Sequence, residues 1–238
     1  MNKKCVINFA RGAWYPRGQQ RLIQSLRQQG WDGDVHTFDD ESQIGLRLLA
    51  CPTHQEAPYA FKAFAFRWAR DNGYDLALWA DASVWAIKPI QPMFDHIAQH
   101  GWMLFYNTIT GLWTSDACLA GFGLSRNQAM EIPMIMATCM GFDLHNQKAQ
   151  DFLDEYLEKS VDGFSLRGSW TNANQEVSTD PRVLGHRHDQ SVASIVAWKL
   201  GIKDLLIAHE SFFAYAATPW PNHEPPKNAS VCMLAQGM

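Results

Sequence analysis

The sequence lacks the features that mark secreted, zinc-binding and membrane-spanning proteins. Its five cysteines are odd in number and none of them is spaced as C-x-x-C, so they predict neither a disulfide framework nor a zinc knuckle. No apolar run has the length of a membrane span, and the apolar stretch Cys5–Ala10 is too short for the core of a signal peptide. We therefore expect no membrane span, and a reducing cytoplasm is the simplest location.

The chain also lacks a basic excess and the common fingerprints of nucleotide-binding proteins and hydrolases. Its formal net charge is −4, which gives no electrostatic signature of nucleic-acid binding, although a nucleic-acid acceptor is not excluded. The motifs G-x-x-x-x-G-K-[ST], G-x-G-x-x-G and G-x-S-x-G do not occur. The 238 residues show no internal repeat and fit a single α/β domain.

What the sequence does contain is an alternation of apolar runs and amphipathic stretches. Cys5–Ala10 predicts a strand, Pro16–Arg27 a helix and Asp34–Phe38 a second strand. A helix is then expected over Pro58–Asp71, and the apolar stretch Tyr74–Trp85 predicts a strand buried on both faces. This order indicates right-handed parallel units, so we predict an α/β fold with a mostly parallel sheet flanked by helices.

The second half of the chain carries weaker signals. The expected elements are a helix over Met93–Gln99, a strand over Trp102–Tyr106, a long functional loop over Thr108–Ala120, a helix over Asn127–Cys139 interrupted at Pro133, a strand over Met140–Leu144, a helix over Gln147–Lys159 and a strand over Leu205–Ala208. The polar segment Asp162–Arg182 has no period, which predicts a mobile loop or lid.

Asp81 lies where the buried strand ends. Ligands of open α/β sheets bind outside the carboxyl ends of the strands, so Asp81 is expected at the mouth of a site. The alternative is that Asp81 only begins a turn, which is common for aspartate. In the same way, Gly12 after the first strand suits either a nucleotide-binding loop or an ordinary turn.

Lys62 lies in the middle of a helix that is apolar on most of its surface. A buried lysine needs a partner, which could be an anionic ligand or Asp81. The third possibility is that the side chain extends its ammonium to water.

A second polar cluster, Gly185–Ser191, precedes an apolar stretch that predicts a helix ending at Gly201. Asp189 is placed as a helix N-cap, and that structural role by itself could explain it. His186 and His188, spaced as H-x-H, also suggest a metal. A metal-dependent hydrolase that uses His186, His188 and Asp189 is therefore one alternative.

With both clusters in view, the chain resembles the GT-A nucleotide-sugar glycosyltransferases, most nearly the family 8-like enzymes. The resemblance rests on Lys62, on Leu78–Ser83 where the family carries its D-x-D motif, and on His188-Asp189-Gln190 where it carries a D-Q pair. It implies a GT-A (Rossmann-like) fold in one domain, 1–238. Residues 1–107 would form the nucleotide-sugar-binding half, and 108–238 the acceptor-binding half.

The resemblance also implies roles for individual residues. A divalent cation, Mn²⁺ or Mg²⁺, would bridge the donor diphosphate and bind Asp81, Ser83 and a late histidine, either His209 or His223. Ser83 departs from the family because it replaces the second carboxylate, so Lys62 and Arg11 could act in place of a metal. The implied donor-binding residues are Ala10, Arg11, Gly12, Lys62, Asp81, Ser83 and His188.

Asp189 and Gln190 are the expected catalytic residues. Asp189 would act as a base for the acceptor hydroxyl or support an oxocarbenium-like transition state, and Gln190 would hydrogen-bond the sugar. Trp113 and Trp170 could stack on the acceptor, which could be a glycan, a small metabolite or a modified nucleic-acid base. A UDP-sugar is the favoured donor, and transfer of a hexosyl or a pentosyl group is expected. The alternative of another class is a GT-A-fold protein that binds a nucleotide or sugar without catalysis.

Overall fold

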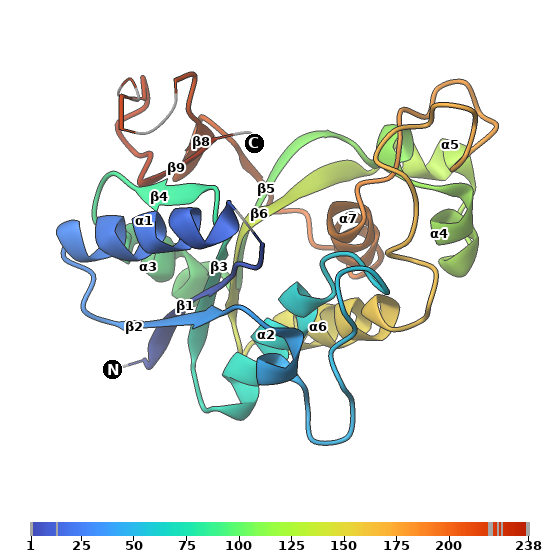
Figure 1. Cartoon of the computed structure of the whole chain (residues 1–238). Coiled ribbons are helices and arrows are strands. Elements are labelled where there is room, and N and C mark those ends of the chain that lie inside the picture. The colour runs from blue at the N-terminus through green and yellow to red at the C-terminus, as the bar shows by residue number, and fades with distance from the viewer. Residues whose placement is uncertain (1, 13, 219–220, 223, 225, 237–238) are drawn as a thin grey trace.

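The computed structural model describes residues 2–12, 14–218, 221–222, 224 and 226–236. Its centre is a six-stranded sheet (Figure 1). The strand order is β2 (Asp34–Phe38), β1 (Lys4–Phe9), β3 (Leu76–Ala80), β6 (Pro133–Asp143), β5 (Trp102–Ile109) and β7 (Leu206–Ile207). Only β6 runs against its neighbours, so the sheet in the described chain is mostly parallel, as the sequence predicted.

Two layers of helices cover the sheet, and successive residues of each strand face different layers. In β1, Cys5 and Ile7 pack in one hydrophobic cluster while Val6 packs in the other. The first cluster is built with α2 (Phe61–Asp71), α6 (Gln147–Ser160) and α7 (Asp189–Lys199). The second is built with α1 (Tyr15–Gln28) and α3 (Gln91–His100). Strands buried on both faces explain why β3 is apolar throughout.

A small second sheet lies beside the end of β3 and contains the last described strand. Its order is β4 (Val84–Ala86), β9 (Met233–Ala235) and β8 (Phe213–Tyr215). The backbone N–H of Gln236 donates to the carbonyl of Ser83 at 3.3 Å. The C-terminal part of the chain is thereby placed next to the turn that carries Asp81 (Figure 1).

The expected helix over 127–139 is wrong. The helix α5 covers only Arg126–Ala129, and β6 begins at Pro133. Met134–Phe142 lie buried between β3 and β5, and a run that is apolar on both faces does not reveal whether its period is that of a strand or a helix. Pro133, which would interrupt a helix, instead occupies the first position of a strand.

The expected loop 108–120 also contains regular structure. It starts on β5 and continues through the 3₁₀-helix η2 (Thr110–Trp113) into α4 (Asp116–Gly121). The expected strand over 205–208 is reduced to β7, while 162–182 forms no helix or strand, as predicted for a loop. A further 3₁₀-helix, η1 (Glu41–Ile44), follows β2.

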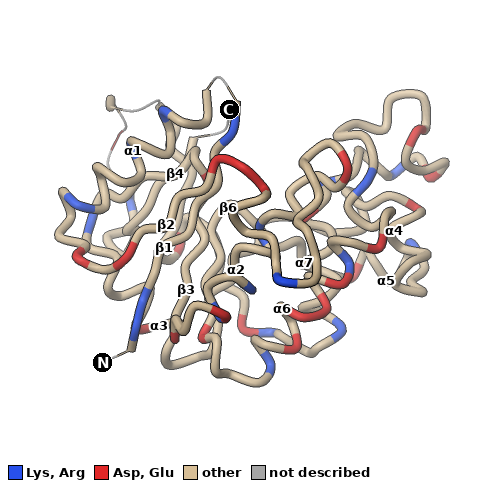
Figure 2. The backbone as a smooth tube through the Cα atoms, turned by 60° about the horizontal axis from the view of Figure 1, so that its bottom comes forward, with Lys and Arg blue, Asp and Glu red and all other residues tan. Residues whose placement is uncertain are grey.

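The placement of the charged residues and of the cysteines is consistent with the small net charge and the odd number of cysteines in the sequence. Figure 2 shows basic and acidic residues interspersed along the described chain. All five cysteines are buried free thiols. Among the described residues, no helix has both the length and the apolarity to cross a membrane.

Candidate functional site

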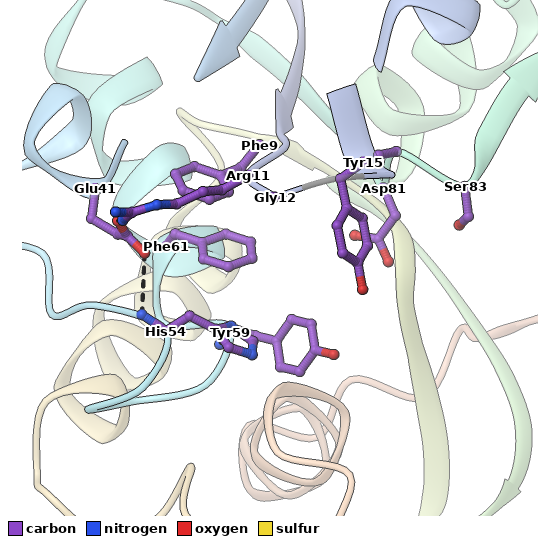
Figure 3. A pocket seen from close by; sticks show the side chains of 11 residues that line it. Phe9, Arg11, Gly12, Tyr15, Glu41, His54, Tyr59, Phe61, Asp81 and Ser83 are labelled. Atoms are coloured by element: carbon purple, nitrogen blue, oxygen red, sulfur yellow. Dashed lines mark hydrogen bonds and ion pairs between the residues drawn. The ribbon is translucent and has the colours of Figure 1, made fainter. Parts of the chain in front are cut away.

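A cavity of about 280 Å³ lies at the carboxyl ends of β1 and β3 (Figure 3). Its wall is largely aromatic, with Phe9 and Phe61 stacked at 4.3 Å between ring centroids. Tyr15 and Tyr59 complete the apolar part, and the polar part comes from Arg11, Glu41, His54, Asp81 and Ser83. Such a mixture of aromatic rings and a few polar groups is typical of a ligand pocket.

Asp81 is held firmly at the edge of this cavity. Its backbone N–H donates to the carbonyl of Thr138 on β6 at 2.9 Å, and its Oδ1 accepts from the indole Nε1 of Trp79 at 2.7 Å. The turn that follows packs against α1, where a side chain on Gly18 would lie 2.0 Å from the carbonyl oxygen of Ala82. The turn therefore has a fixed position relative to the sheet.

Lys62 joins two carboxylates that are far apart in the sequence. Its Nζ lies 3.0 Å from Asp81 Oδ1 and 2.8 Å from Asp189 Oδ2, and it donates to the carbonyl of Ala137 at 2.8 Å. The side chain of Lys62 is 2% exposed, that of Asp189 4% and that of Asp81 28%. Asp81, one of the partners considered for Lys62 from the sequence, is therefore a partner in the structure. Asp189 is a second partner, which the sequence did not indicate.

The three charges affect one another because they are poorly solvated. Burial acts to lower the pKa of Lys62, but attraction to Asp189 and Asp81 outweighs it and the pKa is raised. Burial raises the pKa of Asp81, against the opposing effect of the Lys62 ammonium. Two carboxylates and one ammonium leave the cluster with one net negative charge when all three are ionised.

These residues do not fit a resident divalent cation. Within the described part of the chain, no three His, Cys, Asp or Glu side chains form a group able to hold a metal ion. Oδ1 of Asp81 already binds an ammonium and an indole N–H, and Ser83 offers only a neutral hydroxyl. His209 is exposed, with its ring 6.3 Å from that of Tyr215, and His223 lies outside the described residues.

Arg11 and Gly12 follow β1 and line the cavity, whereas Ala10 is buried and does not. The Arg11 Nη1 donates to Glu41 Oε2 at 2.6 Å, and Glu41 Oε1 accepts from the backbone N–H of His54 at 3.1 Å (Figure 3). Nε and Nη2 of Arg11 have no acceptor among the described residues. They remain available to an anionic ligand.

His186 has a structural role that leaves neither ring nitrogen for the metal considered as an alternative. Its Nδ1 accepts from the backbone N–H of Ser115 at 3.2 Å, and its Nε2 donates to the carbonyl of Ser165 at 3.0 Å. Burial lowers its pKa to about 3. Both ring nitrogens are occupied, so a hydrolase site built on His186, His188 and Asp189 is not supported.

His188 differs from His186 because one ring nitrogen stays free. Nδ1 donates to the carbonyl of Leu166 at 2.8 Å, and no described residue bonds to Nε2. Its backbone φ of 44° is unusual for a residue other than glycine, as is the φ of 64° at Tyr59, whose ring lies 5.7 Å from that of His188. Strain of this kind is concentrated at functional sites.

The side chain of Arg187 lies between the rings of Trp113 and Trp170. The guanidinium carbon of Arg187 lies 4.0 Å from the ring centroid of Trp113 and 4.4 Å from that of Trp170. The Trp170 ring lies 6.2 Å from that of Tyr59, which also lines the cavity. Gln190 is half-buried in the first turn of α7, beside Asp189.

Sequence reasoning missed several members of the site. Tyr59 lies within the helix predicted over Pro58–Asp71, but α2 begins at Phe61, and Tyr59 has a left-handed backbone and lines the cavity. Glu41 ends the acidic run Asp39–Glu41, a composition typical of a solvated loop, yet it is buried. No local pattern marks Tyr15 or Arg187, because their partners lie far away in the sequence.

No protein-family model matches the chain, and no curated protein matches it. Solved structures do resemble it. A bifunctional glycosyltransferase, WbbM, aligns with a TM-score of 0.56 at 10% identity, covering 98% of this chain and 45% of that one. This chain therefore spans less than half of the length of WbbM.

Two further structures match over nearly their whole length. One is a glycosyltransferase involved in glycosylation of the major capsid of PBCV-1, with a TM-score of 0.52 at 11% identity, covering 97% of this chain and 93% of that one. The other is mouse xyloside xylosyltransferase 1, with a TM-score of 0.52 at 9% identity, covering 98% and 96%. The chain thus has the GT-A fold of these glycosyltransferases, and this likeness shows the fold alone.

Proposed function

We propose that this GT-A-fold chain is a glycosyltransferase that moves a sugar from a nucleoside-diphosphate sugar to a hydroxyl group of an acceptor. The observation that carries the proposal is the Asp81–Lys62–Asp189 cluster beside an aromatic cavity at the carboxyl edge of the sheet. A buried charge cluster next to a ligand-sized cavity indicates a functional site. The solved structures with TM-scores above 0.5 are named as glycosyltransferases, which supports the same reaction class.

The donor would bind in the half formed by residues 1–107. All the residues that line the cavity lie in this half. The aromatic wall offers faces on which a base can stack, and the free N–H groups of Arg11 can bind a phosphate. A UDP-sugar remains the first donor to test, and the division into two halves within one domain remains part of the proposal.

The transfer step would take place beside the Asp81–Lys62–Asp189 cluster. The acceptor oxygen would bond to the anomeric carbon as the bond from that carbon to the diphosphate breaks, and the hydroxyl proton would pass to the departing diphosphate. Asp189 is nearly inaccessible and its Oδ2 is held by Lys62, which suits electrostatic support of the anomeric carbon better than proton abstraction. Gln190 and His188 would then contact the transferred sugar, whether hexosyl or pentosyl.

No part of this step is assigned to Mn²⁺ or Mg²⁺, because the donor set around Asp81 does not fit a divalent cation. The negative charge that develops on the diphosphate would instead face the free N–H groups of Arg11. We expect EDTA to leave donor binding unchanged. A donor-induced stabilisation that disappears with EDTA and returns with Mn²⁺ would contradict this expectation.

The proposal is tested by thermal unfolding with UDP-, GDP-, CMP- and TDP-linked sugars. A ligand that binds only the native state raises the melting temperature by mass action. We expect one nucleotide to give a clear shift that is lost in Asp81→Asn and kept in Asp95→Asn, which lies on α3 away from the cavity. Release of free nucleotide on adding an acceptor separates a transferase from a protein that only binds. No shift with any donor would overturn the proposal.

A further inference from the structure

Arg187 is a half-buried arginine whose guanidinium lacks a polar partner. It lies between the indoles of Trp113 and Trp170 at 4.0 and 4.4 Å, and no described residue accepts a hydrogen bond from it or forms an ion pair with it. Burial lowers its pKa, because the guanidinium has lost part of its hydration. Stacking on two rings compensates for this loss only in part, since it leaves the five N–H donors unused.

Most other arginines of the described chain have at least one oxygen partner for their side chain. Arg126 and Arg182, for example, pair with Asp116 and Asp180 at 2.6 Å. The two arginines besides Arg187 that have no oxygen partner, Arg17 and Arg47, are exposed to water. Within the described residues, Arg187 is therefore the half-buried arginine whose side chain has no oxygen partner.

The backbone around Arg187 gives the stack a defined geometry. Its own N–H donates to the carbonyl of Trp113 at 3.0 Å. The segment that carries Trp170 is held by bonds from His186 N–H to Ser169 carbonyl and from Asn172 N–H to Leu184 carbonyl, both 2.9 Å. Gly185 permits this close approach, because a side chain there would lie 1.9 Å from the carbonyl oxygen of Trp170. The guanidinium is thus pre-positioned between two rings.

The stack lies beside the proposed transfer site. Arg187 is two residues before Asp189, and Tyr59 contacts both the Trp170 ring and the cavity. Trp170 is 45% exposed, so one side of the stack is accessible to a ligand. An acceptor that stacks on Trp170 would bring a substituent of its ring within reach of the Arg187 donors.

We infer that the Trp113–Arg187–Trp170 stack binds an acidic sugar acceptor, a saccharide whose ring carries a carboxylate or a phosphate. This inference rests on the proposed function and names the acceptor class that it leaves open. A planar guanidinium with free N–H groups binds a carboxylate or phosphate through two parallel hydrogen bonds, while an indole face covers the apolar face of a sugar ring. An acidic sugar would supply the hydrogen-bond acceptors that the described chain does not offer to the guanidinium of Arg187.

The test measures direct binding of three matched sugars to the whole protein by calorimetry in the presence of UDP. The probes are methyl β-glucuronide, methyl β-glucoside 6-phosphate and neutral methyl β-glucoside. We expect the two anionic sugars to bind at least about tenfold more tightly than the neutral one. The two anionic probes distinguish a carboxylate from a phosphate, and added salt should reduce the preference.

Arg187→Gln should abolish the preference for anionic sugars, while Arg187→Lys should retain part of it. Arg182→Gln, on the neighbouring segment and paired with Asp180, is the matched control and should keep the full preference. Thermal unfolding of each variant excludes misfolding. Equal or absent binding of all three sugars to the wild type, or an unchanged preference in Arg187→Gln, would overturn the inference.

The two proposals fail in different ways. If UDP stabilises the protein but acidic sugars show no preference, the acceptor inference is wrong and the proposed function remains. If acidic sugars bind through Arg187 but no nucleotide binds, the anion site remains and the transferase proposal is wrong.

Discussion

At the scale of single residues, the site depends on ion pairs between residues that are far apart in the sequence. Lys62 is nearly inaccessible and is stabilised by Asp81 and Asp189, which come from a strand end and from a helix more than a hundred residues later. Removing one member of a buried charge cluster leaves the others uncompensated, which costs more than the loss of a surface pair. Lys62 is therefore expected to contribute to stability as well as to function.

We predict that Lys62→Met lowers the free energy of unfolding by about 3 kcal/mol at pH 7. The reason is that Asp189 would remain buried without a cation. Urea unfolding gives the value, and Lys199→Met, which breaks an exposed pair with Glu155, is the control and should cost less than about 1 kcal/mol. The double variant Lys62→Met/Asp189→Asn should be less destabilised than the sum of the single variants. A loss equal to that of the control would contradict the prediction.

A second residue-scale prediction concerns His186, whose pKa burial lowers from 6.5 to about 3. Below about pH 6.5 the unfolded chain binds a proton that the folded chain does not, so stability is fully present above that pH and is lost as the pH falls toward 3. The limiting contribution of this histidine is about 1.4 kcal/mol per pH unit. His186→Asn should reduce the slope of unfolding free energy between pH 6.5 and 5, as measured by urea unfolding. An unchanged slope would show that His186 becomes protonated in the folded protein.

At the scale of elements, the position of Asp81 depends on helix α1 as much as on strand β3. Gly18 brings α1 against the Asp81–Ser83 turn, and Arg21 Nη2 donates to the Ala82 carbonyl at 3.2 Å. Arg21 also stacks on the ring of Trp85 at 4.5 Å. The turn is thereby fixed from outside the sheet, which a reading of the strand alone could not indicate.

Gly18→Ala should destabilise the protein by about 1–3 kcal/mol, although alanine is the better helix former. The added methyl group would overlap the Ala82 carbonyl, so either α1 or the turn must move. Thermal unfolding measures the stability, and the shift produced by the donor measures the position of the turn; both should decrease. Gln24→Ala, at an exposed position of the same helix, should leave both unchanged or slightly increase stability. Tolerance of Gly18→Ala would mean that the helix moves at little cost.

At the scale of the whole molecule, the cavity and the tryptophan pair belong to different parts of the chain. The lining of the cavity ends at Ser83, whereas Trp113, Trp170, Arg187 and Asp189 all come later. The two groups meet through Tyr59 and through the ion pairs of Lys62. Binding of the donor and of the acceptor should therefore be separable by mutation.

We predict that Trp170→Ala leaves UDP-induced thermal stabilisation unchanged but lowers transfer to an acceptor at least about tenfold, since stacking is worth about 1–3 kcal/mol. Tyr15→Ala, in the cavity wall and 43% exposed, should do the reverse and weaken the UDP-induced shift. Both variants are read by melting temperature and by release of nucleotide. Loss of the UDP effect in Trp170→Ala would show that the two groups form one site.

Local sequence patterns are sufficient to predict the order of the first strands and helices, the buried character of β3 and the placement of Asp81 at a strand end. These features follow from local periodicity and from the rule that parallel strands present their carboxyl ends at one edge. The sequence pattern also predicts the position of Asp189 at the start of a buried helix. Periodicity could not identify β6 as a strand, because a run that is apolar on every side shows neither the period of a strand nor that of a helix.

The pairing of the charges, by contrast, follows from the packing of the folded chain. The packing makes Asp81 and Asp189 joint partners of Lys62, bonds both ring nitrogens of His186 to backbone groups, and leaves His209 exposed. It also placed Arg187 between two indoles that are 57 residues apart in the chain, at positions 113 and 170. Electrostatic and stacking contacts depend on distances between atoms, and for residues far apart in sequence those distances are set by how the layers pack.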